Sequence, residues 1–158
     1  MNTLLNLFKF LIYSLLFSFF YTTALAKSSD WSVSETSKLR LISPFSQNDD
    51  KNLLIGLEYQ MEPGWKTYWK SPGDGGFAQS ISWDNSSNVK NLNILWPTPI
   101  ELEILGITSL GYQNNVIFPL QIELNDELKN TFLNLHISFL ICKDVCIPGD
   151  ATVFLEIP

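Results

Sequence analysis

After residue 26 the chain is a succession of short apolar runs, each ended by Gly, Pro, Asn or Asp. Several runs alternate between apolar and polar residues, as Leu39-Arg40-Leu41 does, and this period is typical of strands with one buried face. Seven or more short strands with frequent turns predict an all-β fold, arranged as a β-sandwich. One short helical turn is expected at 126–130. The expected strands are 37–42, 53–59, 65–70, 80–83, 91–96, 116–124, 134–141 and 152–157.

Residues 1–26 have the features of a secretory signal peptide. A weak positive charge at Lys9 precedes a long, almost wholly apolar stretch, and Ala24-Leu25-Ala26 gives the small-x-small pattern that signal peptidase cleaves. A membrane anchor is the alternative, because the apolar stretch is long, but Asn6 and Lys9 interrupt it. We therefore expect a cleaved signal, a single domain at 27–158 that does not insert into a membrane, and a bacterial periplasm as the compartment.

The charge of the chain argues against two classes of partner. There are 16 Asp and Glu against 10 Lys and Arg, with a formal net charge of -6. The basic residues are thinly spread, so neither nucleic acid nor an anionic membrane surface is an expected partner. No cofactor is expected either, because the Gly-rich end of 65–76 lacks the Gly-Lys-Ser/Thr ending of a nucleotide-binding loop.

The chain has two cysteines, Cys142 and Cys146, separated by three residues. A disulfide between them closes a small ring that stabilises by roughly 2 kcal/mol in the loop-entropy model, so a purely structural bond would be better placed between distant segments. The spacing favours a pair that is opened and closed chemically. Bonded cysteines need Cα atoms within about 7 Å of each other, so the chain must turn at 143–145. Two unpaired buried thiols, or an inert structural clip, are the alternatives.

Two further residues, Tyr68 and Met61, are candidates for a role beside the cysteines, whereas the only histidine is not. Tyr68 lies in an aromatic-rich run and is a candidate for a position near the reactive centre. His136, the only histidine, lies six residues before Cys142, roughly 20 Å along a strand and too far to act as its base. Met61 and the cysteines offer soft ligands for Cu(I), so a copper- or partner-binding sandwich is the alternative function. One histidine and no Cys-x-x-Cys do not make a convincing zinc site.

Six motifs combine aromatic residues, prolines and glycines with the cysteine pair. They are Trp65-x-x-Tyr68-Trp69-x-x-Pro72-Gly73-Asp74-x-Gly76, Trp83, Trp96-Pro97-x-Pro99, Gly111-Tyr112, Pro119-Leu120 and Cys142-Lys143-Asp144-Val145-Cys146-Ile147-Pro148. In this order they resemble the N-terminal periplasmic domain of the DsbD family of thiol:disulfide interchange proteins. The likeness is closest to the ScsB-like branch, which is linked to copper tolerance.

The resemblance implies an immunoglobulin-like β-sandwich in which Cys142 and Cys146 are the catalytic pair. Such a domain receives electrons from a membrane-embedded thiol reductase domain and passes them to thioredoxin-like periplasmic proteins. The chain would then be one component of a protein-disulfide reductase. Copper tolerance and cytochrome c biogenesis are the processes that the resemblance suggests.

The resemblance also implies that a loop around 103–106 caps the cysteines. We expect this loop to span 100–107, because Pro97 and Pro99 stiffen its approach and Gly106 offers a hinge. Ile104 or Leu105 would shield the sulfurs from water, and Glu103, if close by, would raise the thiol pKa through like-charge repulsion. Two features depart from DsbD, which has five residues between its cysteines and an aromatic residue at the cap. The sequence up to Pro158 holds neither a multi-span membrane segment nor a thioredoxin-like segment, so we expect a separate membrane partner.

Overall fold

The computed structural model describes residues 27–44 and 52–158, and the regular elements within them are β-strands. The expected signal peptide at 1–26 lies outside these residues and stays a prediction. No helix in the described part of the chain is long and apolar enough to cross a membrane. The strands are β1 (Lys27–Ser28), β2 (Ser32–Val33), β3 (Ser37–Ser43), β4 (Asn52–Met61), β5 (Lys66–Gly73), β6 (Ser80–Ser82), β7 (Val89–Ile94), β8 (Ile100–Ile104), β9 (Ile107–Gln113), β10 (Asn115–Leu124), β11 (Thr131–Cys142) and β12 (Cys146–Ile157).

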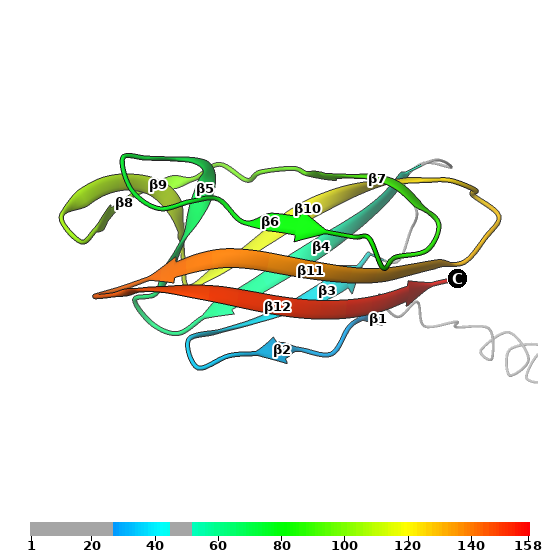
Figure 1. Cartoon of the computed structure of the whole chain (residues 1–158), viewed down its shortest axis with the longest axis horizontal. Helices are drawn as coiled ribbons and strands as arrows, with labels where there is room; N and C mark the ends of the chain where they lie inside the picture. Colours follow the sequence, from blue (N-terminus) through cyan, green and yellow to red (C-terminus); the bar gives the residue numbers. More distant parts are fainter. Residues whose placement is uncertain (1–26, 45–51) are drawn as a thin grey trace, which may run out of the picture.

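The strands form two antiparallel sheets that enclose a common core (Figure 1). The first sheet has the order β1-β3-β4-β10-β7, with β2 paired to β3. The second has the order β12-β11-β5-β9-β8, with β6 paired to β11. The predicted all-β, immunoglobulin-like sandwich is therefore confirmed.

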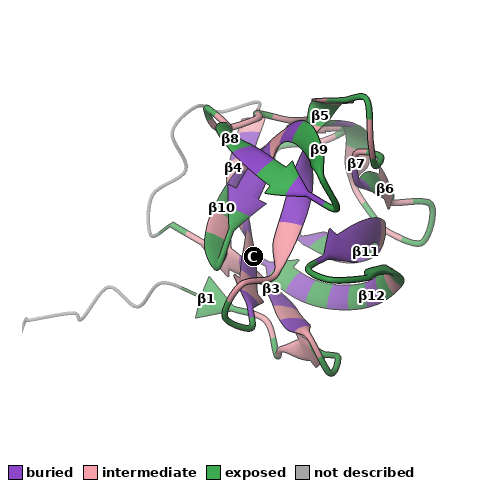
Figure 2. Ribbon diagram, turned by 90° about the vertical axis from the view of Figure 1, so that its left-hand side faces the viewer, coloured by how far each residue is buried: buried purple, intermediate pink, exposed green. Residues whose placement is uncertain are grey.

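The core lies between the sheets because each sheet contributes one apolar face. In β4 every second residue from 53 to 61 is buried. β11 has the same alternation over most of its length, and Figure 2 shows it as stripes along β12. Burying one large apolar side chain stabilises the fold by about 1.5–3 kcal/mol, so these faces hold the two sheets together.

An aromatic cluster fixes the place where the chain enters β8. The fully buried ring of Phe118 meets Tyr112, Tyr59 and Trp96 edge to face, with centroid distances of 5.0, 5.3 and 5.5 Å. Edge-to-face contacts are favourable because the positive ring edge meets the negative ring face. The Tyr112 hydroxyl also donates a hydrogen bond to the carbonyl of Pro97, at 2.8 Å. The Trp-Pro-x-Pro and Gly-Tyr motifs therefore anchor the segment before β8 to the core.

Residues 126–130 form a turn, so the expected helical turn there is wrong. The side-chain amide of Asn88 donates to the carbonyls of Asp126 and Lys129, and the Asp126 carboxylate accepts the N–H of Leu128. These bonds satisfy the backbone locally. A helix this short has too few of its own hydrogen bonds to compete.

β12 begins at Cys146, six residues before the strand expected at 152–157. Pro148 suggested an interruption, because proline cannot donate a backbone hydrogen bond. β12 is the outermost strand of its sheet, and an edge position tolerates the missing donor. The early start places Cys146 directly opposite Cys142 on β11.

Candidate redox site

The two cysteines form a disulfide at the tip of the β11–β12 hairpin. Cys142 ends β11, Cys146 begins β12, and the two residues are direct cross-strand partners with Cα atoms 4.1 Å apart. The turn predicted at 143–145 is confirmed, and it is closed by a hydrogen bond of 3.0 Å from the N–H of Lys143 to the carbonyl of Val145. The hairpin alone therefore brings the sulfurs together.

The two cysteines differ in their access to solvent. Cys142 is completely buried, whereas Cys146 is exposed. A disulfide is opened by a thiolate that attacks one of its sulfur atoms, and access decides which atom is attacked. Cys146 is therefore the more accessible of the two cysteines.

Cys142 belongs to a small apolar cluster that is separate from the main core. Its other members are Tyr68, Leu102, Ile104 and Leu140, each at most 9% exposed. Neighbouring residues of β11 point to opposite faces of the sheet. Residues 139 and 141, which alternate with Leu140 and Cys142 along β11, are in the main core. Leu140 and Cys142 therefore point away from the core, and the disulfide lies on the outer face of the second sheet.

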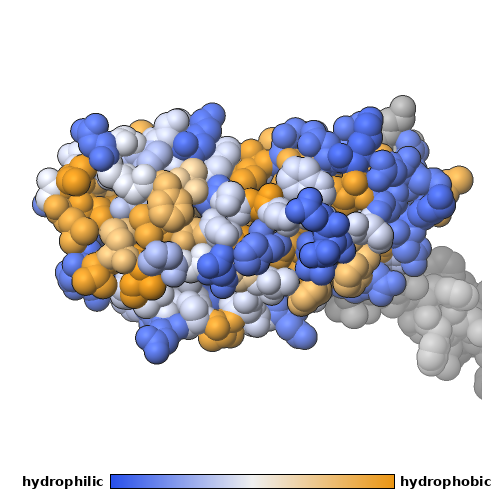
Figure 3. Space-filling model, viewed as in Figure 1, coloured by the Kyte–Doolittle hydropathy of each residue, from blue (hydrophilic) through white to orange (hydrophobic). Residues whose placement is uncertain are grey.

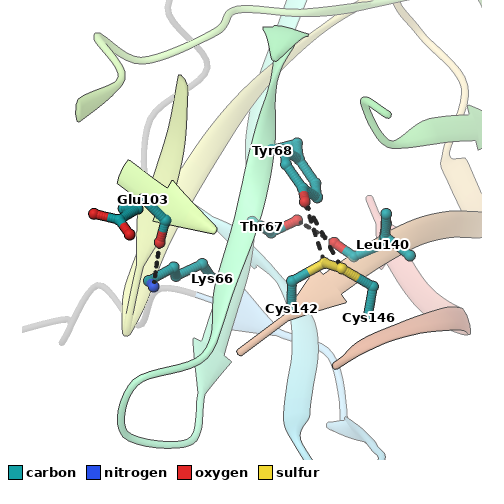
Figure 4. The surroundings of a disulfide bond; sticks show 7 residues. All are labelled: Lys66, Thr67, Tyr68, Glu103, Leu140, Cys142 and Cys146. Atoms are coloured by element: carbon teal, nitrogen blue, oxygen red, sulfur yellow. Dashed lines mark hydrogen bonds between the residues drawn. A yellow bond between two sulfur atoms is a disulfide. The ribbon is translucent and has the colours of Figure 1, made fainter. Parts of the chain in front are cut away.

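The hydroxyl of Tyr68 lies 3.2 Å from Sγ of Cys142 and 3.9 Å from Sγ of Cys146 (Figure 4). The sulfurs of a disulfide carry no hydrogen, so the hydroxyl is the donor in these contacts. Burial raises the pKa of Tyr68 above its ordinary value, and the hydroxyl therefore keeps its proton at neutral pH. Tyr68 was a candidate for a position near the cysteine pair, and in the structure it lies beside both sulfurs.

The segment 100–107 was expected to be a loop, but it belongs to a β-hairpin that packs over the disulfide. β8 and β9 pair along their whole shared length, from the Ile100–Gly111 pair to the Ile104–Ile107 pair. The alternation in β8 buries Leu102 and Ile104 against Cys142. Ile104 thus packs in the cluster that contains Cys142, on a paired strand that Leu105 and Gly106 connect to β9.

Glu103 does not take the position that was expected of it. It lies between Leu102 and Ile104 on β8, so the strand alternation turns its side chain outward, and it is exposed. Figure 4 shows its carboxylate pointing away from the sulfurs. Its backbone carbonyl accepts a hydrogen bond of 2.8 Å from the Lys66 ammonium. Glu103 therefore helps to attach β8 to β5, and repulsion of the thiols by its charge has no basis in this geometry.

Comparison of the chain with known protein families and solved structures agrees with the motifs and with this site. The model of a protein family described as thiol:disulfide interchange protein DsbD, N-terminal, matches residues 38–158. The chain belongs to this family. It is also similar to the crystal structure of the N-terminal periplasmic domain of ScsB from Proteus mirabilis, with 30% identity and a TM-score of 0.69. That match covers 83% of this chain and 51% of the other, so the chain spans about half of its relative's length. No curated protein matches the chain.

Thr67 of this DsbD N-terminal domain adds to the site, and the sequence did not point to it. Thr67 is buried, and its hydroxyl donates a hydrogen bond of 3.0 Å to the carbonyl of Leu140. β5 and β11 share only the pairs of Thr67 with Ile141 and of Lys66 with Cys142. The Thr67 bond therefore adds a contact between β5 and β11, beside Tyr68 and Cys142.

The other sequence candidates lie elsewhere in the domain. Met61 is in the main core cluster, which contains neither cysteine. His136 is exposed on β11, where its Nε2 lies 3.3 Å from Asp150. Within residues 27–44 and 52–158 there is no group of three or more His, Cys, Asp or Glu side chains that could hold a metal ion.

The turn of the covering hairpin holds a leucine in an unfavourable conformation. Leu105 has φ = 53° and is 59% exposed, whereas the other non-glycine residues with positive φ in the described part of the chain, at 88 and 114, are asparagines. A left-handed conformation costs a branched residue about 1–2 kcal/mol. Asn-Gly is the preferred pair for a two-residue hairpin turn of this kind, so local stability does not explain a leucine here.

We expect Leu105→Asn to stabilise the oxidised domain by about 1 kcal/mol, because asparagine tolerates the left-handed conformation. The free energy of unfolding in urea, compared with that of the parent, measures the effect. Asn114→Leu is the reverse substitution at another position with positive φ (64°), in the bend that connects β9 to β10, and should destabilise the domain. An unchanged urea midpoint in Leu105→Asn would contradict the strain at this position.

Proposed function

We propose that this domain exchanges disulfides with partner proteins through Cys142 and Cys146. The observation that carries the proposal is the asymmetry of the bond. Cys146 is exposed to a partner, while Cys142 is buried against a hydroxyl that can stabilise its thiolate. A disulfide with a purely structural role needs neither an exposed cysteine nor a hydroxyl beside the buried one. Membership of the DsbD N-terminal family supports the same function.

Reduction of the domain then proceeds in two balanced steps. A thiolate of the electron donor attacks Sγ of Cys146, forming a bond between the donor sulfur and Cys146. The Cys142–Cys146 bond breaks, and its electron pair leaves on Cys142, where the Tyr68 hydroxyl donates a hydrogen bond to the new thiolate. The second thiolate of the donor attacks the donor's own sulfur and releases Cys146 as a thiolate. The donor leaves as a disulfide, and the domain holds two reduced cysteines.

Reduction of a client reverses these steps. The Cys146 thiolate attacks the client disulfide and forms a mixed disulfide. Cys142 then attacks Sγ of Cys146, which closes the original disulfide and releases the client with both of its cysteines reduced. Cys146 is thus the exchanging cysteine and Cys142 the resolving cysteine. In this scheme the domain is one component of a protein-disulfide reductase.

The surface around the disulfide suits a protein partner. Hydrophobic side chains gather at the end of the molecule where the β8–β9 hairpin and the β11–β12 turn lie (Figure 3). The exposed apolar residues of the β8–β9 hairpin, and of the β11–β12 hairpin near its turn, are Ile100, Leu105, Ile107, Val145 and Ile147. Exposed apolar groups close to a reactive centre favour contact with another protein. They also give the strained Leu105 a reason to be retained.

We propose a membrane-embedded thiol reductase domain as the electron donor and thioredoxin-like proteins as clients, in the periplasm. The ScsB relative is itself a periplasmic domain, and the expected signal peptide would export this chain to that compartment. No specific observation favours copper as a ligand, since Met61 lies in the main core.

Trapping of the mixed disulfide tests the proposal. The Cys142→Ser variant retains the exchanging cysteine but cannot resolve an adduct, so it should accumulate a mixed disulfide with an oxidised thioredoxin-like protein. The Cys146→Ser variant retains only the buried Cys142 and should give at least about tenfold less adduct. Non-reducing electrophoresis and mass spectrometry of the linked peptides measure both. Adducts through Cys142 alone would reverse the assigned roles, and no adduct with either variant would contradict the function.

A further inference from the structure

The Gly-rich segment at 73–76 begins at the last residue of β5 and comes back to the aromatic ring of Tyr68. Gly76 has φ = +84°, and a Cβ atom placed on it would lie 2.2 Å from Cζ of Tyr68 and 2.3 and 2.5 Å from the two Cε atoms. Non-bonded carbon atoms pack best at about 3.5–4.0 Å, and Cβ atoms essentially never approach a neighbour closer than 3.0 Å. Only glycine therefore fits at this position while the ring stays where it is.

Gly76 approaches the end of the Tyr68 ring that carries the hydroxyl. Cζ is the carbon atom that carries the hydroxyl, and the hydroxyl contacts both sulfurs. Gly76 is exposed and Tyr68 is only 2% exposed, so the backbone at Gly76 covers the ring on its solvent side. The Cβ position is nearly equidistant from Cζ and the two Cε atoms, so Gly76 lies over one face of the ring, and displacement of the ring toward that face meets the backbone of this residue.

The other glycines of the segment do not have this relation to the ring. Gly73 also has a positive φ, of 96°, but the nearest atom to its Cβ position is the carbonyl oxygen of Thr108, at 3.5 Å. The Cβ position of Gly75 is at least 3.6 Å from any neighbour, and its φ is ordinary. A general need for a flexible turn would affect all three glycines. The contact with Tyr68 singles out Gly76.

We propose that Gly76 is a positioning residue of the redox site, which holds the Tyr68 hydroxyl against the sulfurs of Cys142 and Cys146. The proposal rests on the exchange function and assigns a part in it to the Gly-rich segment. A hydroxyl held in place donates a hydrogen bond to a thiolate as soon as the thiolate forms, and hydrogen bonding to the charged form lowers the thiol pKa. A hydroxyl that is free to move loses part of this effect.

Three single substitutions separate the ring contact from backbone strain. Gly76→Ala introduces both a clash with the ring and strain at positive φ. Gly73→Ala introduces strain at positive φ with no contact closer than 3.5 Å, and Gly75→Ala introduces neither. Insertion of one glycine between residues 75 and 76 is a fourth variant, which loosens the cover over Tyr68 without any clash and is used if Gly76→Ala does not fold.

The measurement is the rate at which iodoacetamide modifies the fully reduced full-length chain, as a function of pH, read separately for Cys142 and Cys146 by peptide mass spectrometry. In Gly76→Ala the midpoint for Cys142 should rise by about one pH unit, which slows modification at neutral pH about tenfold. The glycine insertion should shift the midpoint in the same direction. Gly73→Ala and Gly75→Ala should keep the parental midpoint.

The Tyr68→Phe background tells positioning apart from a general change in structure. There the hydroxyl is absent, so Gly76→Ala should produce no further shift of the Cys142 midpoint. A parental midpoint in Gly76→Ala would overturn the proposal, and so would an equal shift in Gly73→Ala or an undiminished shift in the Tyr68→Phe background. The reagent is a small molecule and no partner takes part, so the result is independent of whether the trapping experiment supports exchange.

Discussion

Ile104→Ala is expected to speed the modification of the reduced cysteines by a small alkylating reagent by about 30-fold. Ile104 is 3% exposed and packs in the cluster that buries Cys142. Truncation of a buried isoleucine to alanine costs about 2–5 kcal/mol. If 2 kcal/mol of this is lost from the contact that keeps the β8–β9 hairpin closed, the open state becomes about 30 times more populated, because 1.4 kcal/mol is a factor of ten.

The control lies on the same strand. Ile100 is 52% exposed, so Ile100→Ala removes the same atoms from β8 without opening the cluster, and its alkylation rate should stay close to that of the parent. Both variants should keep the far-UV spectrum of the parent, which separates local opening from loss of the fold. Equal rates in Ile104→Ala and the parent would show that Ile104 does not shield the sulfurs.

Local patterns in the sequence were sufficient to predict most of the fold. The two-residue alternation in β4 and β10 is visible in the sequence because each strand buries one face against the core. The turn at 143–145 followed from the geometry of a bonded cysteine pair four residues apart. Both arguments use residues that are close together in the chain, and no information about distant contacts was needed.

The cover over the disulfide could not be predicted with the same success. The prolines at 97 and 99 and the two carboxylates suggested a loop at 100–107, but Ile100-Glu101-Leu102-Glu103-Ile104 alternates as a strand does. That alternation would have identified Leu102 and Ile104 as buried and Glu103 as exposed. The strand becomes stable only through pairing with β9, which in turn pairs with β5.

The chemistry of the site depends on contacts that are remote in the sequence. Tyr68 and Cys142 are 74 residues apart and meet because β5 and β11 are neighbours in the second sheet. The burial of Cys142 and the exposure of Cys146 likewise come from neighbouring strands and from the position of β12 at the sheet edge. No pattern within the cysteine motif distinguishes the two residues, so the exchanging cysteine was assigned only from the structure.

Tyr68→Phe is expected to raise the pKa of the Cys142 thiol by about one unit, since a hydrogen bond to a charged group contributes about 1.5–3 kcal/mol and one pKa unit is 1.36 kcal/mol. The substitution keeps the ring that fills the cluster and removes only the hydroxyl at 3.2 Å from Sγ. That hydroxyl favours the thiolate, so the folded-state thiol pKa is depressed by its presence. Its loss moves the pH profile of the modification of Cys142 by iodoacetamide to higher pH.

The matched control is Tyr112→Phe, which also removes a buried tyrosine hydroxyl, but one bonded to the carbonyl of Pro97. It should destabilise the fold by about 1 kcal/mol through the lost hydrogen bond and leave the Cys142 profile where it is in the parent. A thiolate with a higher pKa is also a poorer leaving group. The oxidised Tyr68→Phe domain should therefore be reduced more slowly by dithiothreitol, and the Tyr112→Phe domain at the parental rate. An unshifted Cys142 profile in Tyr68→Phe would leave Tyr68 as a packing residue, and stabilisation of the leaving thiolate would then have to come from another group.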